Sequence, residues 1–189
     1  MNIIRDCQTL AKRMTWALGA LTLLLAISQP APVLADELDF EYKLKTAYLF
    51  NFAKFTTWRH LNNQPKKIDL CVTDLDKYEG MKEQLSGRAL GQMSLNIKSV
   101  RPNESIEECE ILFVDEANEA EWLERVEGLA SVLTVGESRS FLKEGGIIQF
   151  YIENGKLRFA VNIDSLRKSS VNIEGRMLRL AKRVGGGEL

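Results

Sequence analysis

Cysteine has the widest possible chemistry of any residue type in this sequence, because thiols form disulfides, bind metals and act as nucleophiles. Cys71 and Cys109 lie in the body of the chain, and Cys7 lies close to its start. Metal binding is disfavoured, since a site needs three or four ligands and His60 is the only histidine. A Cys71–Cys109 disulfide is favoured in an oxidising compartment, with two separate buried thiols as the alternative.

Motifs that commit a protein to one reaction are missing from the sequence. There is no Gly-x-Ser-x-Gly elbow, no phosphate-binding Gly-x-x-x-x-Gly-Lys-Ser/Thr and no His-Glu-x-x-His. A Ser/His/Asp arrangement would have to use His60, which is predicted to lie in a loop. The acidic residues Asp74, Asp76 and Glu79 lack the glycine and the spacing of a calcium loop. We therefore expect a protein that is not an enzyme and that carries no metal or cofactor.

Polar side chains on one predicted strand could line a small-molecule pocket. Residues two apart on a strand share a face, so Arg158 and Asn162 are expected on the same side of the strand 157–162. Together with Arg176 they could bind a carboxylate or a phosphate. The alternative is that they form the solvated side of a hairpin.

An aromatic-rich segment could supply a protein–protein contact. Residues 39–58 carry apolar side chains at three- and four-residue steps, which predicts a helix with Glu41 and Lys45 on its solvated side. Six aromatic residues lie within residues 40–55, which is more apolar area than one helix stripe needs. The alternative is a helix packed between a sheet and other elements. The candidate contact residues are Tyr48, Phe52 and Trp58.

The elements that position these residues alternate between strand and helix. Residues 153–156 contain Asn154-Gly155, a strong hairpin signal, between two apolar runs. The pattern predicts a layered α/β fold with a mostly parallel mixed sheet, an antiparallel hairpin at one edge and helices on both faces. The predicted strands are 68–72, 93–100, 110–115, 131–136, 147–152 and 157–162, and the predicted helices include 79–85, 118–129 and 174–184.

The start of the chain has the pattern of a secretory signal peptide. Basic residues are followed by a twelve-residue apolar run, 16–27, and a short polar stretch that ends at Ala35. A bilayer span needs about twenty residues, so cleavage after Ala35 is favoured over a retained anchor. We expect residues 1–35 to be removed and residues 36–189 to form one domain in the periplasm, which is an oxidising compartment.

The charge of the chain gives no case for nucleic-acid binding. The formal net charge is −1, and removal of residues 1–35 makes it about −3. Basic residues gather near the end, but they are predicted to lie on the solvated face of the helix 174–184.

Several segments, in their order along the chain, resemble the YfiR family of exported regulatory proteins. The resemblance extends over nearly all of residues 36–189. The segments are 41–58 (Glu41-Tyr42 to Thr57-Trp58), 68–72, 109–114 (Cys109 to Val114), 132–136, Phe141 with 145–148, 158–162 (Arg158 to Asn162) and 176–181.

The resemblance implies a periplasmic α/β protein that is not an enzyme. Members of the best-known type restrain a diguanylate cyclase of the inner membrane by holding its periplasmic sensor region, which lowers cyclic di-GMP and biofilm growth. The resemblance also implies a Cys71–Cys109 disulfide, a tendency to form homodimers, and a cyclase or another membrane sensor as partner. The alternative function is that of a periplasmic accessory protein that binds a small ligand.

Overall fold

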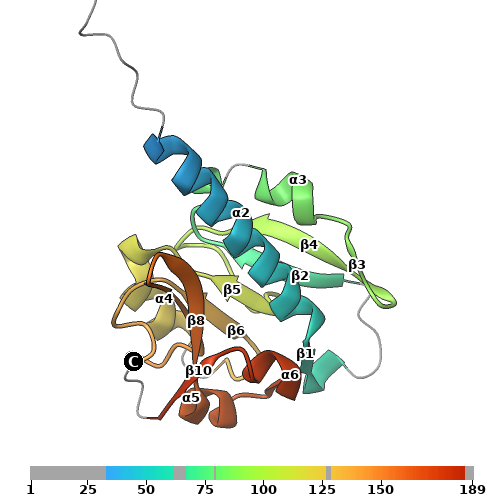
Figure 1. The fold of residues 1–189 in the computed structure, drawn as a ribbon. Helices are drawn as coiled ribbons and strands as arrows, with labels where there is room; N and C mark the ends of the chain where they lie inside the picture. The colour runs from blue at the N-terminus through green and yellow to red at the C-terminus, as the bar shows by residue number, and fades with distance from the viewer. Residues whose placement is uncertain (1–32, 62–66, 79, 127–128, 186–189) are drawn as a thin grey trace, which may run out of the picture. The chain divides into compact units, whose positions relative to one another are not determined.

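The computed structural model describes residues 33–61, 67–78, 80–126 and 129–185 (Figure 1). Residues 39–189 group as one unit, and the description below concerns that unit. The basic start and the apolar run lie outside the described residues, so the signal peptide and its cleavage after Ala35 stay predictions. Among the described residues, no helix is long and apolar enough to cross a membrane.

The centre of the fold is an eight-stranded mixed sheet (Figure 1). Five of its neighbouring strand pairs are parallel, and only β7–β8 and β3–β4 are antiparallel. This confirms the predicted α/β class with a mostly parallel sheet. In spatial order the strands are β10 (Lys182–Val184), β8 (Lys156–Asn162), β7 (Ile148–Glu153), β6 (Leu133–Gly136), β5 (Ile111–Phe113), β2 (Lys67–Val72), β4 (Met93–Ser99) and β3 (Ala89–Leu90).

Helices cover both faces of the sheet, as predicted. Alternate residues of a strand point to opposite faces, and β5 shows the result. Phe113 packs in one apolar cluster with Phe52 of α2 (Val33–Lys54). Leu112 packs in a second cluster with Trp122 of α4 (Glu119–Val126). The remaining helical segments are η1 (Arg59–Leu61), η2 (Leu75–Lys77), α3 (Met81–Leu85), η3 (Glu116–Asn118), α5 (Ile163–Lys168) and α6 (Gly175–Leu178).

The predicted end of the aromatic helix is wrong by four residues. Helix α2 ends at Lys54, and Thr56–Trp58 forms strand β1 instead. Two β-branched threonines and a tryptophan favour extended structure, and β1 gains an antiparallel partner in β9 (Val171–Ile173). Pairing with a distant strand therefore overrides the helical periodicity.

The predicted helix 174–184 is also wrong, because only α6, four residues long, is helical there. The chain then turns and forms β10, which pairs in parallel with β8 and buries Val184 in the second apolar cluster. The predicted antiparallel pair at one edge of the sheet is confirmed, but that pair is β3–β4, since β10 lies outside the β7–β8 hairpin.

The hairpin itself is confirmed. Asn154 and Gly155 both have positive φ, 51° and 68°, between β7 and β8. Two consecutive positive φ angles are what a tight turn needs to match the twist of the paired strands.

The segment between β6 and β7 depends on two glycines that contact one aromatic ring. Phe141 is fully buried, and a Cβ added at Gly136 or Gly146 would overlap its ring. We expect Gly136→Ala to lower the free energy of unfolding by about 2 kcal/mol, because overpacking a filled core forces side chains and backbone to shift. Chemical denaturation measures this. The control is Gly175→Ala, where the nearest atom, Arg179 Nη1, is 3.8 Å from the added Cβ; equal losses for both variants would contradict the steric explanation.

Candidate functional site

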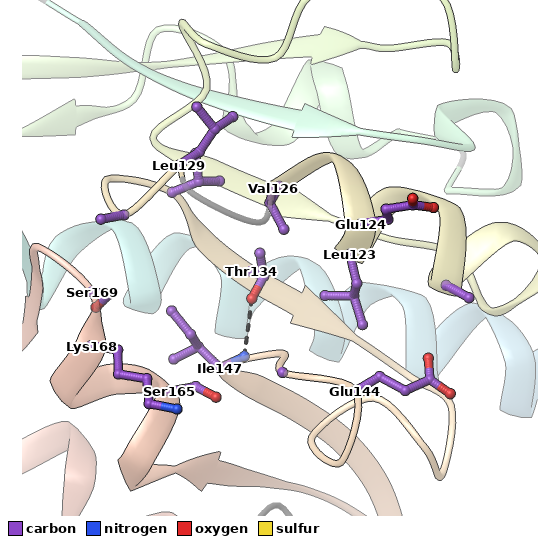
Figure 2. Close-up of a pocket in the computed structure, with 14 residues that line it drawn as sticks. Leu123, Glu124, Val126, Leu129, Thr134, Glu144, Ile147, Ser165, Lys168 and Ser169 are labelled. Carbon is purple, nitrogen blue, oxygen red and sulfur yellow. Dashed lines mark hydrogen bonds between the residues drawn. The ribbon is translucent and has the colours of Figure 1, made fainter.

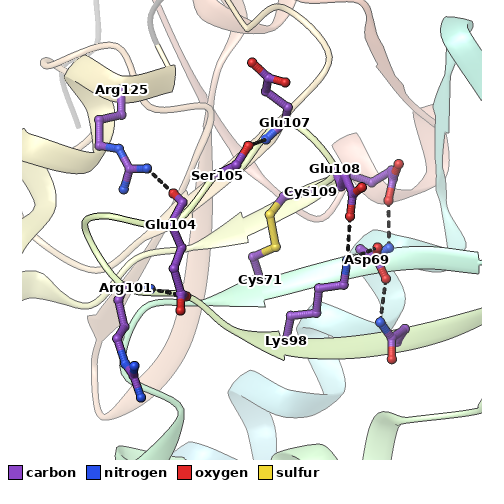
Figure 3. Close-up of a disulfide and its surroundings, with 12 residues drawn as sticks. Asp69, Cys71, Lys98, Arg101, Glu104, Ser105, Glu107, Glu108, Cys109 and Arg125 are labelled. Carbon is purple, nitrogen blue, oxygen red and sulfur yellow. Dashed lines mark hydrogen bonds and ion pairs between the residues drawn. A yellow bond between two sulfur atoms is a disulfide. The ribbon is translucent and has the colours of Figure 1, made fainter.

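The predicted disulfide joins Cys71 on β2 to Cys109, just before β5 (Figure 3). The two Cα atoms are 5.8 Å apart and both residues are buried in the second apolar cluster. Near it, Lys98 of β4 forms ion pairs with Asp69 (2.6 Å) and Glu108 (3.1 Å). The bond thus links neighbouring strands on the face covered by α4, where it is shielded from solvent.

Two of the three predicted partner contacts are core residues. Phe52 is 0% exposed and stacks on Phe150 of β7 with ring centroids 5.8 Å apart. Trp58 is also buried, and its Nε1 donates to the carbonyl of Glu110 at 3.1 Å. Both are therefore ruled out as surface contacts in this structure. Tyr48 is half-buried and packs edge-on against Phe159. The surplus aromatic area of α2 serves mainly to hold it on the sheet.

The three predicted ligand residues have different surroundings. The amide of Asn162 is committed to structure: its Oδ1 accepts the backbone N–H groups of Asp164 and Ser165, which caps α5, and its Nδ2 donates to the carbonyl of Leu142 at 2.8 Å. Asn162 is therefore a buried cap rather than a ligand group. The other two residues, Arg158 and Arg176, are exposed, and Arg176 lies over the ring of Phe55.

Exposed apolar side chains mark a different candidate surface. Ile152 of β7 is 56% exposed and Leu180, just before β10, is 69% exposed. Lys182 pairs with Ala160 and Ile152 pairs with Leu157, so Ile152 and Leu180 lie at the same end of the three-stranded ribbon β7–β8–β10. Arg158, on the strand between them, is also exposed, but it pairs with Tyr151, so its side chain points to the opposite face of the ribbon from Ile152. We call Ile152 and Leu180 the ribbon-end surface.

The sequence predicts Leu180 inside the helix 174–184, which does not form at that residue, and Ile152 at the end of the strand 147–152. A signal was present for Ile152, since it lies one residue before the turn segment that begins at Glu153. Apolar residues at a hairpin tip have little sheet left to cover them. For Leu180 no such signal exists, because its exposure depends on β10 pairing with β8.

A buried polar network lies beside the carboxyl ends of the parallel strands β2, β5 and β6. Lys45 of α2 is 4% exposed, and its Nζ contacts Glu41 at 2.6 Å and Glu137, just after β6, at 2.9 Å. Tyr78 donates from its hydroxyl to Glu137 at 2.7 Å. Burial first and Glu137 second raise the pKa of Tyr78 above its ordinary value, so it remains a neutral donor.

The expectation that Lys45 faces solvent is therefore wrong. Its side chain is buried, and Glu41 and Glu137 supply the compensating charge. In open α/β sheets, ligands usually bind at the carboxyl ends of the parallel strands, at the point where neighbouring strands send their connections to opposite faces of the sheet. Here α2 and its ion pairs occupy part of that region, so the network serves to hold α2. Among the described residues, no three His, Cys, Asp or Glu side chains are grouped as a metal site.

The model of the YfiR/HmsC-like family matches residues 42–182. The chain belongs to the YfiR/HmsC-like family. Members of this family are known as regulators of diguanylate cyclases. The match begins inside α2 and ends at the first residue of β10. It therefore includes the disulfide, the ribbon-end surface and Lys45 with Glu137 and Tyr78, whereas Glu41 lies one residue before it.

A solved structure has a similar fold to this YfiR/HmsC-like chain. It is the crystal structure of a conserved domain protein from Vibrio cholerae O1 biovar El Tor, with a TM-score of 0.50 and 8% sequence identity. The alignment covers 75% of this chain and 59% of that one, so the chain spans well under two thirds of that protein's length. At this identity the likeness concerns the fold alone.

A buried carboxyl group of this chain, that of Glu119, is predicted to make its stability depend on pH. Glu119 of α4 is 4% exposed and accepts hydrogen bonds from the hydroxyl (2.7 Å) and the backbone N–H (3.1 Å) of Ser138. Burial raises the pKa of Glu119 to about 7, Glu144 and Glu116 add to the rise, and the two bonds from Ser138 oppose it. The group thus binds its proton more tightly in the folded than in the unfolded chain.

We expect the free energy of unfolding to fall by up to about 3 kcal/mol as pH rises from about 4.5 to about 7, because the unfolded chain loses this proton first. In Glu119→Gln that part of the pH dependence should disappear. Urea denaturation at a series of pH values measures it, with exposed Glu121→Gln on the same helix as control. A pH profile that is the same in Glu119→Gln and the wild type would show that the carboxyl titrates normally.

Proposed function

We propose that this protein is an exported regulator that restrains a diguanylate cyclase of the inner membrane by binding the periplasmic sensor region of that cyclase. The observation that carries the proposal is the family match over residues 42–182. The protein would act as a binding partner and not as a catalyst. Its control over the cyclase would follow from mass action, since a protein that binds only one state of its partner lowers the population of the other.

We assign the contact with the cyclase to the ribbon-end surface. Interfaces are commonly centred on a few anchors with a polar rim, and Ile152 and Leu180 are exposed apolar residues that can serve as anchors. Strands β7 and β8 are joined by a ladder of six residue pairs, so Ile152 is presented on a rigid support. A rigid support lowers the entropy cost of binding.

The compartment that we propose is the periplasm. The leader pattern of residues 1–35 would deliver the chain there, and a buried disulfide is stable in an oxidising compartment. After cleavage at Ala35 the single domain 36–189 would act either alone or as a homodimer. Tyr48, which is half-buried, remains a candidate contact at the margin of either interface.

Capture of membrane proteins from the native host tests the proposal. The tagged, processed chain should retain a membrane cyclase, and Ile152→Asp should weaken that binding roughly 30-fold, the effect of losing one central anchor. The control is Gln92→Asp, an exposed residue of the β3–β4 turn at the opposite edge of the sheet. Recovery of no cyclase by the folded wild type would contradict the function, and full binding by Ile152→Asp would contradict only the surface.

A further inference from the structure

A pocket of about 620 Å³ opens on the face of the sheet that α4 covers (Figure 2). Its walls come from α4, from β6, from the segment that leads into β7, and from α5. The volume lies within the range of about 300–1,000 Å³ that small-molecule sites have in proteins. The apolar side chains that line it are Leu123, Val126, Leu129, Val132 and Ile147.

Opposite charges stand at opposite sides of this pocket. Figure 2 shows the carboxylates of Glu124 and Glu144 at one side, and Lys168 with the hydroxyl of Ser165 at the other. All three charged residues are exposed at the rim. The apolar side chains lie between the two charged ends, so the pocket is electrically polarised along its length.

A buried hydroxyl adds a polar group to the floor. Thr134 of β6 is 4% exposed, and its Oγ1 accepts the backbone N–H of Ile147 at 3.0 Å (Figure 2). A threonine hydroxyl that accepts one hydrogen bond still has its own O–H to donate. The floor can therefore satisfy an acceptor, such as a carbonyl, at mid-length.

We propose that this pocket binds a small elongated molecule with a free ammonium group at one end, a carboxylate at the other and an apolar body between them. The ammonium would lie against Glu124 and Glu144, and the carboxylate against Lys168 and Ser165. Two sources share this chemistry: short apolar peptides with free ends, and ω-amino acids. An α-amino acid with an uncharged side chain does not fit, because its ammonium and carboxylate groups are attached to the same carbon and cannot reach both ends.

The proposal does not depend on the cyclase or on the ribbon end. Neither Ile152 nor Leu180 lines the pocket. The pocket is also separate from the ligand residues that the sequence suggested, since neither Arg158 nor Arg176 belongs to its lining. Failure of one proposal therefore leaves the other standing.

Calorimetric titration of the processed chain tests the site with named probes. Leucyl-leucine and 8-aminooctanoate represent the two sources, and N-acetyl-leucyl-leucine and leucyl-leucinamide each lack one charge. We expect at least one free-ended probe to bind, and removal of either charge to weaken binding roughly fivefold or more. Binding of only one free-ended probe supports the site and identifies the source.

Matched variants locate the binding. Lys168→Ala and Glu144→Gln should weaken binding of the probe roughly fivefold. Their controls, Arg167→Ala and Glu153→Gln, change exposed residues outside the lining and should leave binding of the probe unchanged. Thermal unfolding of each variant shows that it is folded. No binding of either free-ended probe at millimolar concentration, equal binding of the blocked probes, or equal effects of Lys168→Ala and Arg167→Ala would each overturn the proposal.

Discussion

Reduction of the Cys71–Cys109 disulfide is expected to lower the free energy of unfolding by about 4 kcal/mol, because a loop closed across 38 residues restricts the unfolded chain. In the folded chain β2 and β5 are already hydrogen-bonded neighbours, and the backbone N–H of Glu110 donates to the carbonyl of Asp69 at 3.0 Å. The bond therefore adds little new contact to the folded state. Guanidinium denaturation with and without reductant measures the difference.

The double variant Cys71→Ser, Cys109→Ser is the control for the disulfide. It should unfold at a lower denaturant concentration than the oxidised wild type, and reductant should not change its midpoint. Identical midpoints for oxidised and reduced wild-type protein would contradict a stabilising role for the bond.

Replacement of Lys45 by alanine is expected to cost about 3 kcal/mol of unfolding free energy, since it leaves the carboxylate of Glu137 in a largely buried position without its cation. Glu137 would keep only the hydrogen bond from Tyr78 among its contacts in the network. The loss should loosen α2, whose attachment to the sheet depends on Lys45 as well as on Leu49 and Phe52.

A control variant and a double variant separate the charge effect from lost packing. Lys54→Ala on the same helix is exposed and should change stability by less than about 0.5 kcal/mol. The pair Lys45→Met, Glu137→Gln should be more stable than Lys45→Met alone, because it removes the unpaired charge while keeping the volume. Equal stability of Lys45→Ala and Lys54→Ala would show that the Lys45 network contributes nothing.

The strands buried on both faces were predictable because their signal is local. Residues 111–114 are a continuous apolar run and residues 132–135 are apolar except for Thr134, and these segments form β5 and β6 with only small shifts of their ends. The β7–β8 hairpin was equally clear, since Asn154-Gly155 selects the turn. Local propensity and tertiary position agree in these segments.

The elements that sequence reasoning missed depend on partners far along the chain. Strands β1 and β10 have three residues each, and their extended form follows from pairing with β9 and β8. No local pattern encodes such a pairing. The burial of Lys45 did carry a signal, because it lies four residues before Leu49 and seven before Phe52, on the same face of α2. The prediction placed Lys45 in solvent because of its charge. The structure buries it because Glu137, 92 residues later, supplies the opposite charge.

The surface that we assign to a partner differs from the one predicted from the sequence, again because burial depends on parts of the chain that are far apart. Aromatic residues were expected to face a partner, but Phe52 of α2 is buried in the core and Tyr42, Tyr48 and Phe50 are half-buried. The large apolar side chains that are exposed in the described part of the chain are Phe40, near the start of α2, and Ile152 and Leu180 at the ribbon end. Which apolar residues a fold leaves uncovered depends on the layout of all its elements.

Measurement of the cyclic di-GMP level in the native host tests the central proposal most directly. Deletion of this chain should raise the cyclic di-GMP level, and expression of the wild type or of Gln92→Asp should restore it. Ile152→Asp, exported and folded, should fail to do so. An unchanged level of cyclic di-GMP after deletion would contradict the proposal that the protein restrains a cyclase.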